Sequence, residues 1–135
     1  MENIKQIIVM RKDLNMRKGK IAAQAGHACV AAVLAAMDKE GGFRWNINED
    51  GIVGFDESYL SQWLNSGMAK ICLGVEDKRE LLAIYNKAKE MNLICELIED
   101  AGITEFHGNP TITCLAFAPY PADVIDKLTG KLSLY

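Results

Sequence analysis

The stretch KQIIVMRKDLNMRKGKIAAQAGHACVAAVLAAMDK, residues 5–39, decides the fold of this chain. Its first part, from Lys5 to Met10, carries a continuous run of β-branched and other apolar residues, which is typical of a strand buried on both faces. After a polar turn, the residues from about Lys18 to Lys39 favour a helix, and eight alanines lie between Ala22 and Ala36. This order predicts a strand followed by a long helix that packs closely against a sheet.

The rest of the chain continues this alternation of strands and helices. We expect strands over 70–75, 93–98 and 111–117, and helices over 56–65, from 77 onward and over 121–128. The last strand follows the third without an intervening helix, so it is expected to run antiparallel. The sequence therefore predicts a single domain over residues 1–135 with an α/β fold, in which three α/β/α layers surround a mixed, mostly parallel four-stranded sheet.

Residues 41–55 allow two interpretations. Trp45 and Ile47 alternate with polar residues, and Asp50-Gly51 is a turn signal, which together fit a short surface hairpin. An ordered loop fits equally well. Asp56 is expected to cap the helix that follows.

The composition fits a packed protein of the cytosol. Of the 135 residues, 50% are hydrophobic and 24% are charged, which supports one folded core. We expect no apolar run long enough to cross a bilayer, and Met1 to Gln6 lack the features of a signal peptide. A cytoplasmic location without a membrane partner follows. The four cysteines are interpreted as small buried residues in a reducing compartment. Neither their spacing nor the two histidines predict a metal site, and no cofactor is expected.

A basic segment opens the predicted long helix. The net charge of -3 argues against a general nucleic-acid coat. Five cations nevertheless lie between residues 11 and 20: Arg11, Lys12, Arg17, Lys18 and Lys20. A helix start with free N–H groups is a natural phosphate site and clustered cations strengthen it, although a solvated helix start is the alternative. Lys20, Gln24 and His27 share one helix face, and a buried, hydrogen-bonded role is favoured for His27.

A second polar segment, Asp100-Ala101-Gly102-Ile103-Thr104, follows the third predicted strand. Open α/β sheets bind ligands beyond the carboxyl ends of their parallel strands. If the first and third strands are parallel, this segment and the basic segment project from the same edge of the sheet. Asp100 then has two possible roles, as a base that orients water or as a turn residue before Gly102, and its position alone does not choose between them.

These segments resemble the type 2 peptidyl-tRNA hydrolases. The likeness is carried by RKDLNMRKGKIAAQ (residues 11–24), by DAGIT (residues 100–104), by the C-terminal PADVIDKLTGKLSLY (residues 121–135) and by residues 62–70. It implies a mixed four-stranded sheet flanked by helices, usually in a homodimer. It also implies a metal-independent enzyme that hydrolyses the ester bond between a peptide, or an N-blocked amino acid, and the 3′ end of tRNA, and so recycles tRNA from peptidyl-tRNA.

Residue by residue, the resemblance implies a site. Lys20 matches the lysine usually held essential, Asp100 matches the acidic residue of the site, and Thr104 and Thr113 match its threonines. In these catalytic roles Asp100 orients water, Lys20 holds the oxyanion or the terminal phosphates, and the threonines position water or the substrate carbonyl. Attack by a threonine in place of water stays open. The residues expected to bind the substrate or its tRNA are Arg11, Lys12, Arg17, Lys18 and Gln24.

Three departures from the family pattern keep an alternative open. Glu105 stands where a glutamine is expected, the loop Phe106 to Thr111 is one residue longer, and the segment 41–56 looks inserted relative to the shortest relatives. These features are compatible with a non-catalytic paralogue of the same fold that binds a tRNA end or a protein. Hydrolysis of another ester or amide is a more remote possibility.

Overall fold

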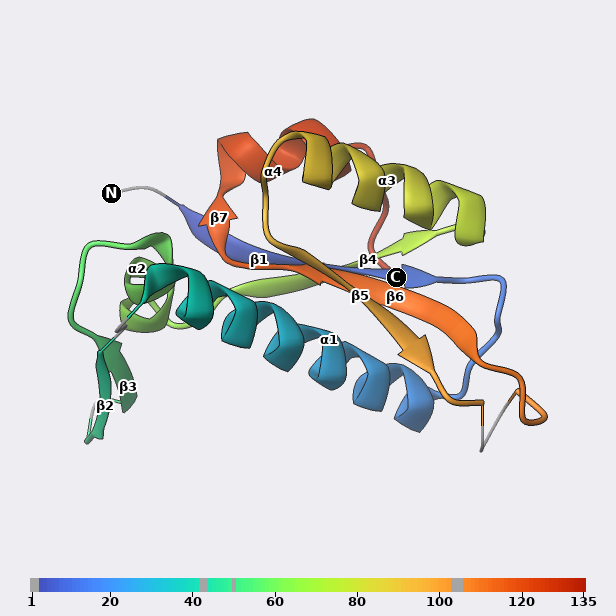
Figure 1. Ribbon diagram of the computed structural model, residues 1–135, viewed down its shortest axis with the longest axis horizontal. Helices are drawn as coiled ribbons and strands as arrows, with labels where there is room; N and C mark the ends of the chain where they lie inside the picture. Colours follow the sequence, from blue (N-terminus) through green and yellow to red (C-terminus); the bar gives the residue numbers. More distant parts are fainter. Residues whose placement is uncertain (1–2, 42–43, 50, 103–105) are drawn as a thin grey trace.

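Strand β1 (Ile4–Arg11) lies inside the sheet, where it pairs with a strand on each side, and the directions of the other strands are given relative to it (Figure 1). The computed structural model describes residues 3–41, 44–49, 51–102 and 106–135. The strand order is β4-β1-β6-β5, in which β4 (Lys70–Val75) runs parallel to β1, and β6 (Thr111–Phe117) runs antiparallel to it. Strand β5 (Cys95–Asp100) is antiparallel to β6, so β1, β4 and β5 all point the same way. The predicted mixed sheet and antiparallel last strand are confirmed; β1, β4 and β5 share one direction, although only β1 and β4 pair in parallel.

The two edges of the sheet differ. At the β4 edge, the Gly74 N–H donates to the carbonyl of Ser133 (3.0 Å) and the Tyr135 N–H donates to the carbonyl of Cys72 (3.1 Å), so the chain end covers this edge. At the other edge β5 is the last strand, and no further strand of the described residues pairs with it. A short additional strand, β7 (Tyr120–Pro121), pairs with the start of β1.

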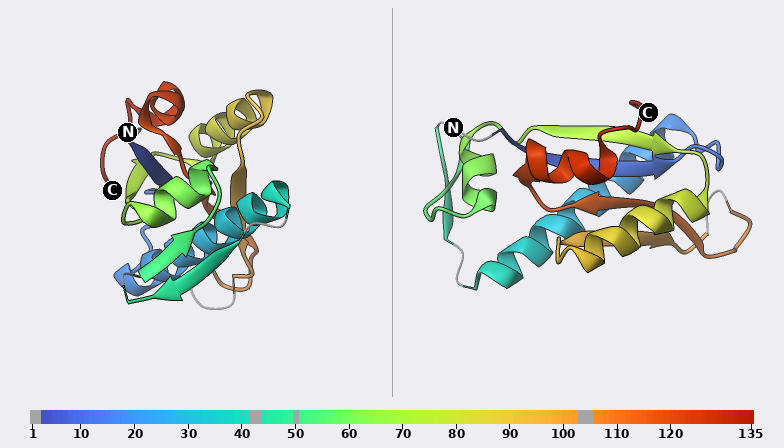
Figure 2. Two further views of the ribbon diagram at one scale, coloured as in Figure 1. Left: turned by 90° about the vertical axis from the view of Figure 1, so that its left-hand side faces the viewer. Right: turned by 90° about the horizontal axis from the view of Figure 1, so that it is seen from above.

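Helices cover both faces of the sheet (Figures 1 and 2). Helix α1 (Lys18–Glu40) lies along one face, and α3 (Lys78–Glu90) and α4 (Ala122–Thr129) lie on the other. This arrangement gives the three predicted layers. Helix α2 (Tyr59–Asn65) packs beside the C-terminal end of α1, next to a small hairpin.

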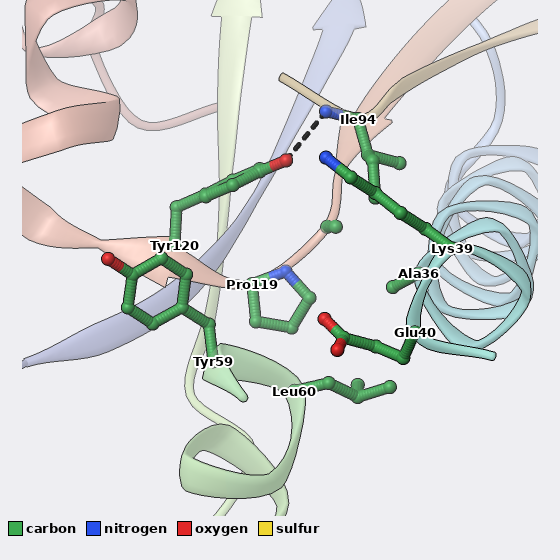
Figure 3. Close-up of a pocket in the computed structure, with 9 residues that line it drawn as sticks. Ala36, Lys39, Glu40, Tyr59, Leu60, Ile94, Pro119 and Tyr120 are labelled. Atoms are coloured by element: carbon green, nitrogen blue, oxygen red, sulfur yellow. Dashed lines mark hydrogen bonds between the residues drawn. The ribbon is translucent and has the colours of Figure 1, made fainter. Parts of the chain in front are cut away.

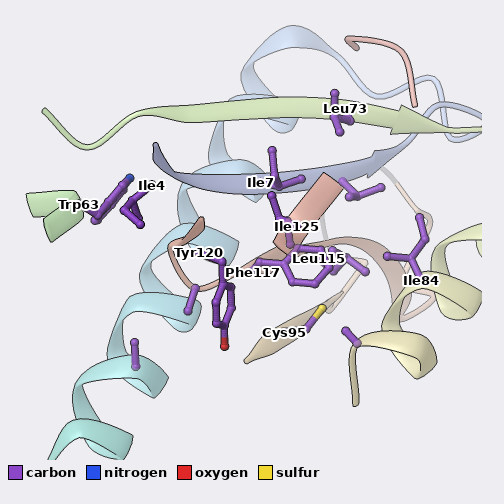
Figure 4. Close-up of a cluster of buried hydrophobic side chains, with 14 of the residues drawn as sticks. Ile4, Ile7, Trp63, Leu73, Ile84, Cys95, Leu115, Phe117, Tyr120 and Ile125 are labelled. Carbon is purple, nitrogen blue, oxygen red and sulfur yellow. The ribbon is translucent and has the colours of Figure 1, made fainter. Parts of the chain in front are cut away.

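Two apolar clusters hold the layers together. The cluster on the α3 and α4 side contains large buried side chains such as Phe117 and Ile125 (Figure 4). The cluster under α1 relies on small residues such as Ala28 and Ala32, which let the helix lie close to β1 and β6. The alanine-rich sequence therefore has the packing role that was predicted for it.

Helix α1 also has the length and composition of a helix that could cross a membrane, so the expectation that no apolar run is long enough is wrong. Its alanines count as apolar although each buries little surface. The core helix of a soluble protein passes the same test, and here α1 lies against the sheet through the buried stripe Gln24, Ala28, Ala32 and Ala36.

The segment between α1 and α2 forms a hairpin of β2 (Trp45–Asn48) and β3 (Gly51–Gly54). Of the two interpretations of residues 41–55, the hairpin is therefore correct and the ordered loop is not. The helix cap differs from the expectation. The Ser58 hydroxyl accepts from the Ser61 N–H (3.1 Å), whereas the Asp56 carboxylate accepts from the Ser58 N–H and the Ser61 hydroxyl. Because α2 begins only at Tyr59, Asp56 lies too far upstream to be its cap and instead orients the residue that is.

The third predicted strand is displaced by two residues. Asn92 adopts a positive φ of 58°, and the Leu93 N–H donates to the carbonyl of Ala88 (3.0 Å), so Leu93 belongs to the capping turn that follows α3. The strand therefore begins at Cys95, and Asp100 becomes its last residue instead of the first residue of a loop. The carboxylate thus stands on a rigid element.

Candidate active site

An ion pair joins the two segments that the sequence singled out. Lys20 lies in the first turn of α1 and Asp100 ends β5, and the Lys20 Nζ is 2.7 Å from the Asp100 Oδ1. Their side chains are only 14% and 13% exposed. Since β1 and β5 point the same way, the helix that follows β1 begins beside the end of β5, as predicted.

The two carboxylate oxygens of Asp100 have different partners. Oδ1 accepts from Lys20 and from the Gln24 Nε2 (3.2 Å), and Oδ2 accepts from the Gly102 N–H (2.9 Å). Gly102 has a φ of 84°, and a Cβ there would lie against the backbone of Asn109. Asp100 therefore makes the turn before Gly102, which is one of the two roles weighed from the sequence, and it also holds Lys20, whereas its role as a base stays a prediction.

The environment keeps Asp100 ionised. The hydrogen bond from Lys20 lowers the pKa of Asp100 most, burial opposes it, and the Gly102 N–H and the Gln24 amide lower it further. The net effect is a pKa below the ordinary value of an aspartate. A carboxylate in this state is a weak proton acceptor but a strong hydrogen-bond acceptor for an ammonium group or a water molecule.

A β-bulge brings Thr113 into the same network. The β5–β6 register runs from Ile98 opposite Cys114 to Glu99 opposite Ile112, which leaves Thr113 as an extra residue. Its buried hydroxyl donates to the Gln24 Oε1 (2.6 Å), and the next residue, Cys114, contacts the Gln24 carbonyl through Sγ (3.6 Å). Two consecutive side chains therefore face α1, which a regular strand does not allow.

The result is a chain of polar contacts from Thr113 through Gln24 to Asp100 and Lys20. Gln24 is 6% exposed and Thr113 is 0% exposed, so Gln24 belongs to the interior of the network. The Phe106 ring lies 5.8 Å from the Lys20 Nζ in a cation–π contact that sequence reasoning did not identify. Thr104 and Glu105 lie outside the described residues.

The prediction for His27 is wrong, because this side chain is exposed. The buried stripe of α1 passes through Gln24 and Ala28, and His27 is rotated from Ala28 by one residue away from the sheet. His27 nevertheless follows Lys20 and Gln24 along one flank of the helix, the flank that contacts Asp100 of β5.

The basic segment divides into two parts. The Arg11 guanidinium donates to both carboxylate oxygens of Asp13 (3.0 and 2.8 Å) and to the Ile112 carbonyl (2.9 Å), and Lys12 pairs with Glu76 (2.8 Å). Through these contacts the two cations join the end of β1 to the ends of its neighbouring strands.

The other part stands at the start of α1. Arg17 is the N-cap residue and Lys18 is the first residue of the helix, and both are exposed. Arg17 makes no side-chain capping hydrogen bond with the described part of the helix, and the first turn of α1 holds no acidic residue. Of the five cations, Arg17 and Lys18 are therefore the exposed ones at the helix start, and the phosphate-binding role of the segment stays a prediction.

Other features of the surface lie away from this network. A cavity of about 220 Å³ is lined at the far end of α1 by Lys39, Glu40, Tyr59 and Tyr120, whose hydroxyl accepts from the Ile94 N–H (2.7 Å) (Figure 3). Along the helix axis it is roughly 28 Å from Lys20. Within the described ranges no group of three or more His, Cys, Asp or Glu side chains is arranged to hold a metal ion.

The whole chain is similar to known proteins. A sequence model of the family described as Peptidyl-tRNA hydrolase PTH2 matches residues 4–135. A protein named peptidyl-tRNA hydrolase from Sulfolobus acidocaldarius is 40% identical over 131 residues, which cover 97% of this chain and 99% of that protein. A protein of the same name from Pyrobaculum aerophilum is 40% identical over 134 residues, or 98% of each chain. A solved structure of a protein of unknown function from Agrobacterium tumefaciens has a TM-score of 0.58 at 11% identity, covers 100% of this chain and 99% of that one, and supports the fold alone.

Proposed function

Because this chain belongs to the Peptidyl-tRNA hydrolase PTH2 family, we propose that Lys20, Gln24, Asp100 and Thr113 form the active site of this enzyme. The enzyme hydrolyses the ester bond between a peptide and tRNA. The observation that carries the site assignment is the nearly buried ion pair between the Lys20 Nζ and the Asp100 Oδ1 (2.7 Å) at the carboxyl end of β5. Such a pair offers a positive group and a water-orienting carboxylate at one point.

The pair suggests how the reaction proceeds. The incoming substrate places its terminal phosphate or its ester carbonyl near Lys20, and the ammonium group turns from Asp100 toward this new negative charge. Losing that contact raises the pKa of Asp100, because the hydrogen bond from Lys20 is the largest cause of its lowering. Asp100 then accepts the proton of a water molecule that attacks the carbonyl carbon. The bond to the ribose oxygen then breaks, and the ribose oxygen leaves with the proton that Asp100 took from the water molecule.

The other residues have supporting roles in this proposal. Thr113 acts as a positioning residue, since its buried hydroxyl holds Gln24, which in turn donates to Asp100. Thr104 keeps its proposed role of positioning water or the carbonyl. The start of α1, with Arg17 and Lys18, binds the phosphates at the 3′ end of the tRNA. Arg11 and Lys12 contribute more to joining the ends of neighbouring strands than to direct phosphate contact.

Cleavage of peptidyl-tRNA by purified protein tests the assignment. Lys20→Ala and Asp100→Asn are each expected to lower kcat by about 100-fold or more, the range for groups that take part in proton transfer or charge stabilisation. Lys39→Ala, at the other end of the same helix, and Glu99→Gln, beside Asp100, serve as matched controls and are expected to keep the wild-type rate. If Lys20→Ala and Asp100→Asn also keep it, the site lies elsewhere. Salt-sensitive tRNA binding without any cleavage would instead favour the non-catalytic paralogue.

The protein is also proposed to act as a homodimer. Large apolar side chains gather around the hairpin and α1: Val30, Leu34, Trp45, Ile47 and Phe55 are between 48% and 63% exposed. Beside them runs a groove of about 260 Å³ with a wholly apolar lining that includes Leu34 and Trp45. A surface of this kind marks protein contacts. Light scattering is expected to give a dimer for the wild type and a monomer for Leu34→Lys with Ile47→Lys. Leu134→Lys, on an exposed leucine at the β4 edge, is the control, and a monomeric wild type contradicts the proposal.

A cytoplasmic location completes the proposal, because ribosomes supply peptidyl-tRNA there. The four cysteines are free, which suits a reducing compartment. Burial raises the pKa of Cys95 to about 12 and that of Cys114 to about 11, so neither thiol ionises readily. Cell fractionation is expected to recover the protein with the cytosol, and recovery with membranes would contradict this location.

A further inference from the structure

The free edge of β5 leads directly to the ion pair. Strand β5 is the last strand of the sheet among the described residues, and it ends at Asp100. It runs between α1 on one face and α3 on the other (Figure 1). An edge strand offers a row of main-chain donors and acceptors to any extended chain that reaches it. The opposite edge of the sheet is closed by the C-terminal residues, so the two edges are not equivalent.

The pairing pattern identifies the groups that point outward. The Ala118 N–H donates to the Ile94 carbonyl, which makes the pairs of Glu96 and Ile98 with β6 the hydrogen-bonded ones in an antiparallel ladder. The N–H and C=O groups of Cys95 and Leu97 therefore point away from β6. No strand among the described residues pairs with these groups, and they form the first part of an open ladder that ends beside the carboxylate.

From these observations we propose that the free edge of β5 binds the peptide part of peptidyl-tRNA as an added strand, an inference that rests on the proposed function. The ester joins the C-terminal residue of the peptide to tRNA, and the ester must lie at Asp100. The peptide therefore runs back along β5 toward Cys95, parallel to it. A parallel neighbour is a pairing that the sheet already makes between β1 and β4.

The surroundings of this edge fit an extended peptide of any sequence. Lys20 and Gln24 lie on the flank of α1 that contacts Asp100. His27 and Ala31 follow them on this flank at helical spacing; His27 is exposed and Ala31 is half-buried. Main-chain pairing recognises the backbone that all peptides share, and alternate side chains of the added strand point outward from the sheet on both faces. An enzyme whose substrates carry peptides of many sequences needs this kind of recognition.

The first test compares two substrates that share the same tRNA and the same C-terminal residue. One carries a single N-acetylated amino acid, and the other carries an N-acetylated hexapeptide, long enough to follow the six residues of β5. The hexapeptide substrate is expected to have a KM about fivefold to tenfold lower, the effect of one or two ordinary hydrogen bonds. N-methylation of its peptide bonds, one at a time, is expected to raise KM at every second residue only. Equal KM values with no alternating pattern overturn the inference.

A variant pair tests the same edge from the enzyme side. Leu97→Pro removes an outward N–H and is compatible with an edge strand, and Leu97→Ala removes the same side chain but keeps the N–H. Leu97→Pro is expected to raise KM for the hexapeptide substrate about fivefold over Leu97→Ala while leaving the single-residue substrate unchanged. An equal loss on both substrates contradicts the inference and leaves hydrolysis standing. Absence of cleavage of either substrate by the wild type contradicts the proposed function, and the inference falls with it.

Discussion

Replacing Thr113 by valine removes one hydroxyl and keeps the shape of the side chain. In the wild type this hydroxyl is fully buried and donates to the Gln24 Oε1 over 2.6 Å. The variant leaves that oxygen without its donor in the interior. Because Gln24 also donates to Asp100 through its Nε2, the amide is then free to rotate away from the carboxylate.

The expected loss of stability follows from these contacts. A lost hydrogen bond together with a buried acceptor left unpaired lowers the free energy of unfolding by about 2 kcal/mol. For a domain of this size, this corresponds to a decrease in Tm of about 7 °C. In the assay we expect kcat to fall about tenfold to 100-fold because Asp100 loses one of the groups that orient it. The KM is expected to stay near the wild-type value, since a side chain with no exposed surface does not contact the substrate.

The measurement requires both thermal unfolding and steady-state kinetics at a temperature well below Tm. Thr111→Val on the same strand is the matched control, because the Thr111 hydroxyl donates only to the Asn109 carbonyl near the surface. It is expected to change stability by about 0.5 kcal/mol or less and to keep kcat. A kcat for Thr113→Val within about twofold of the wild type would refute the positioning role. An equal fall in kcat for Thr111→Val would show that the effect comes from the strand as a whole.

Three further predictions concern the ion pair, the turn and the helix start. The pKa of Asp100 is lowered, so the stability that its ionised form contributes is present above the ordinary carboxyl pKa and is lost as pH falls through the lowered value. Carbon NMR titration is expected to show this low midpoint in the wild type, and a midpoint closer to the ordinary value in Lys20→Met. Gly102→Ala is expected to lower the free energy of unfolding by roughly 3 kcal/mol or more and to reduce kcat, because the φ of Gly102 is 84° and a Cβ there would meet backbone atoms. Gly108 has a φ of 81° but open space around it, so Gly108→Ala is expected to lose about 1 kcal/mol and to keep kcat in the same melting and rate measurements. Lys18→Gln is expected to weaken tRNA binding and to reduce the slope of log affinity against log salt by about one, and an unchanged slope would place the phosphates elsewhere.

The sequence was sufficient to predict the elements that position the ion pair. The apolar run at the start of β1 and the alanine-rich helix after it defined a β–α unit, and the lack of a helix before β6 indicated its antiparallel direction. The prediction that Lys20 and Asp100 lie at the same edge of the sheet depended on β1 and β5 pointing the same way, which the structure confirms. Their direct contact also requires that α1 extend from β1 across β6 to β5, which strand direction alone does not determine.

The remaining parts of the site depend on contacts that a single sequence does not contain. The bulge at Thr113 exists only relative to the register of β5, and a run such as Thr111 to Phe117 has no local signal for it. The different roles of the cations also depend on distant contacts. In the sequence Arg11 and Lys12 look equivalent to Lys18, and only the positions of Asp13 and Glu76 show that the first two are held in ion pairs. His27 was misplaced because one residue on a helix equals a rotation of about 100°, and the sequence did not fix which stripe faces the sheet.

The ion pair with Lys20 has two opposite effects on Asp100, since it stabilises the ionised carboxylate and weakens it as a base. While Lys20 holds the carboxylate, its pKa is low, which stabilises the fold and makes the group a poor base toward water. A substrate that draws Lys20 toward its own negative charge removes the hydrogen bond most responsible for that low pKa. In the proposed mechanism the base is then strengthened only when a phosphate or a developing oxyanion is present, so the site is expected to be least reactive while it is empty. In the same proposal the Gly102 N–H and the Gln24 amide keep the carboxylate in place during this exchange, and Thr113 contributes by holding Gln24 although its hydroxyl is buried.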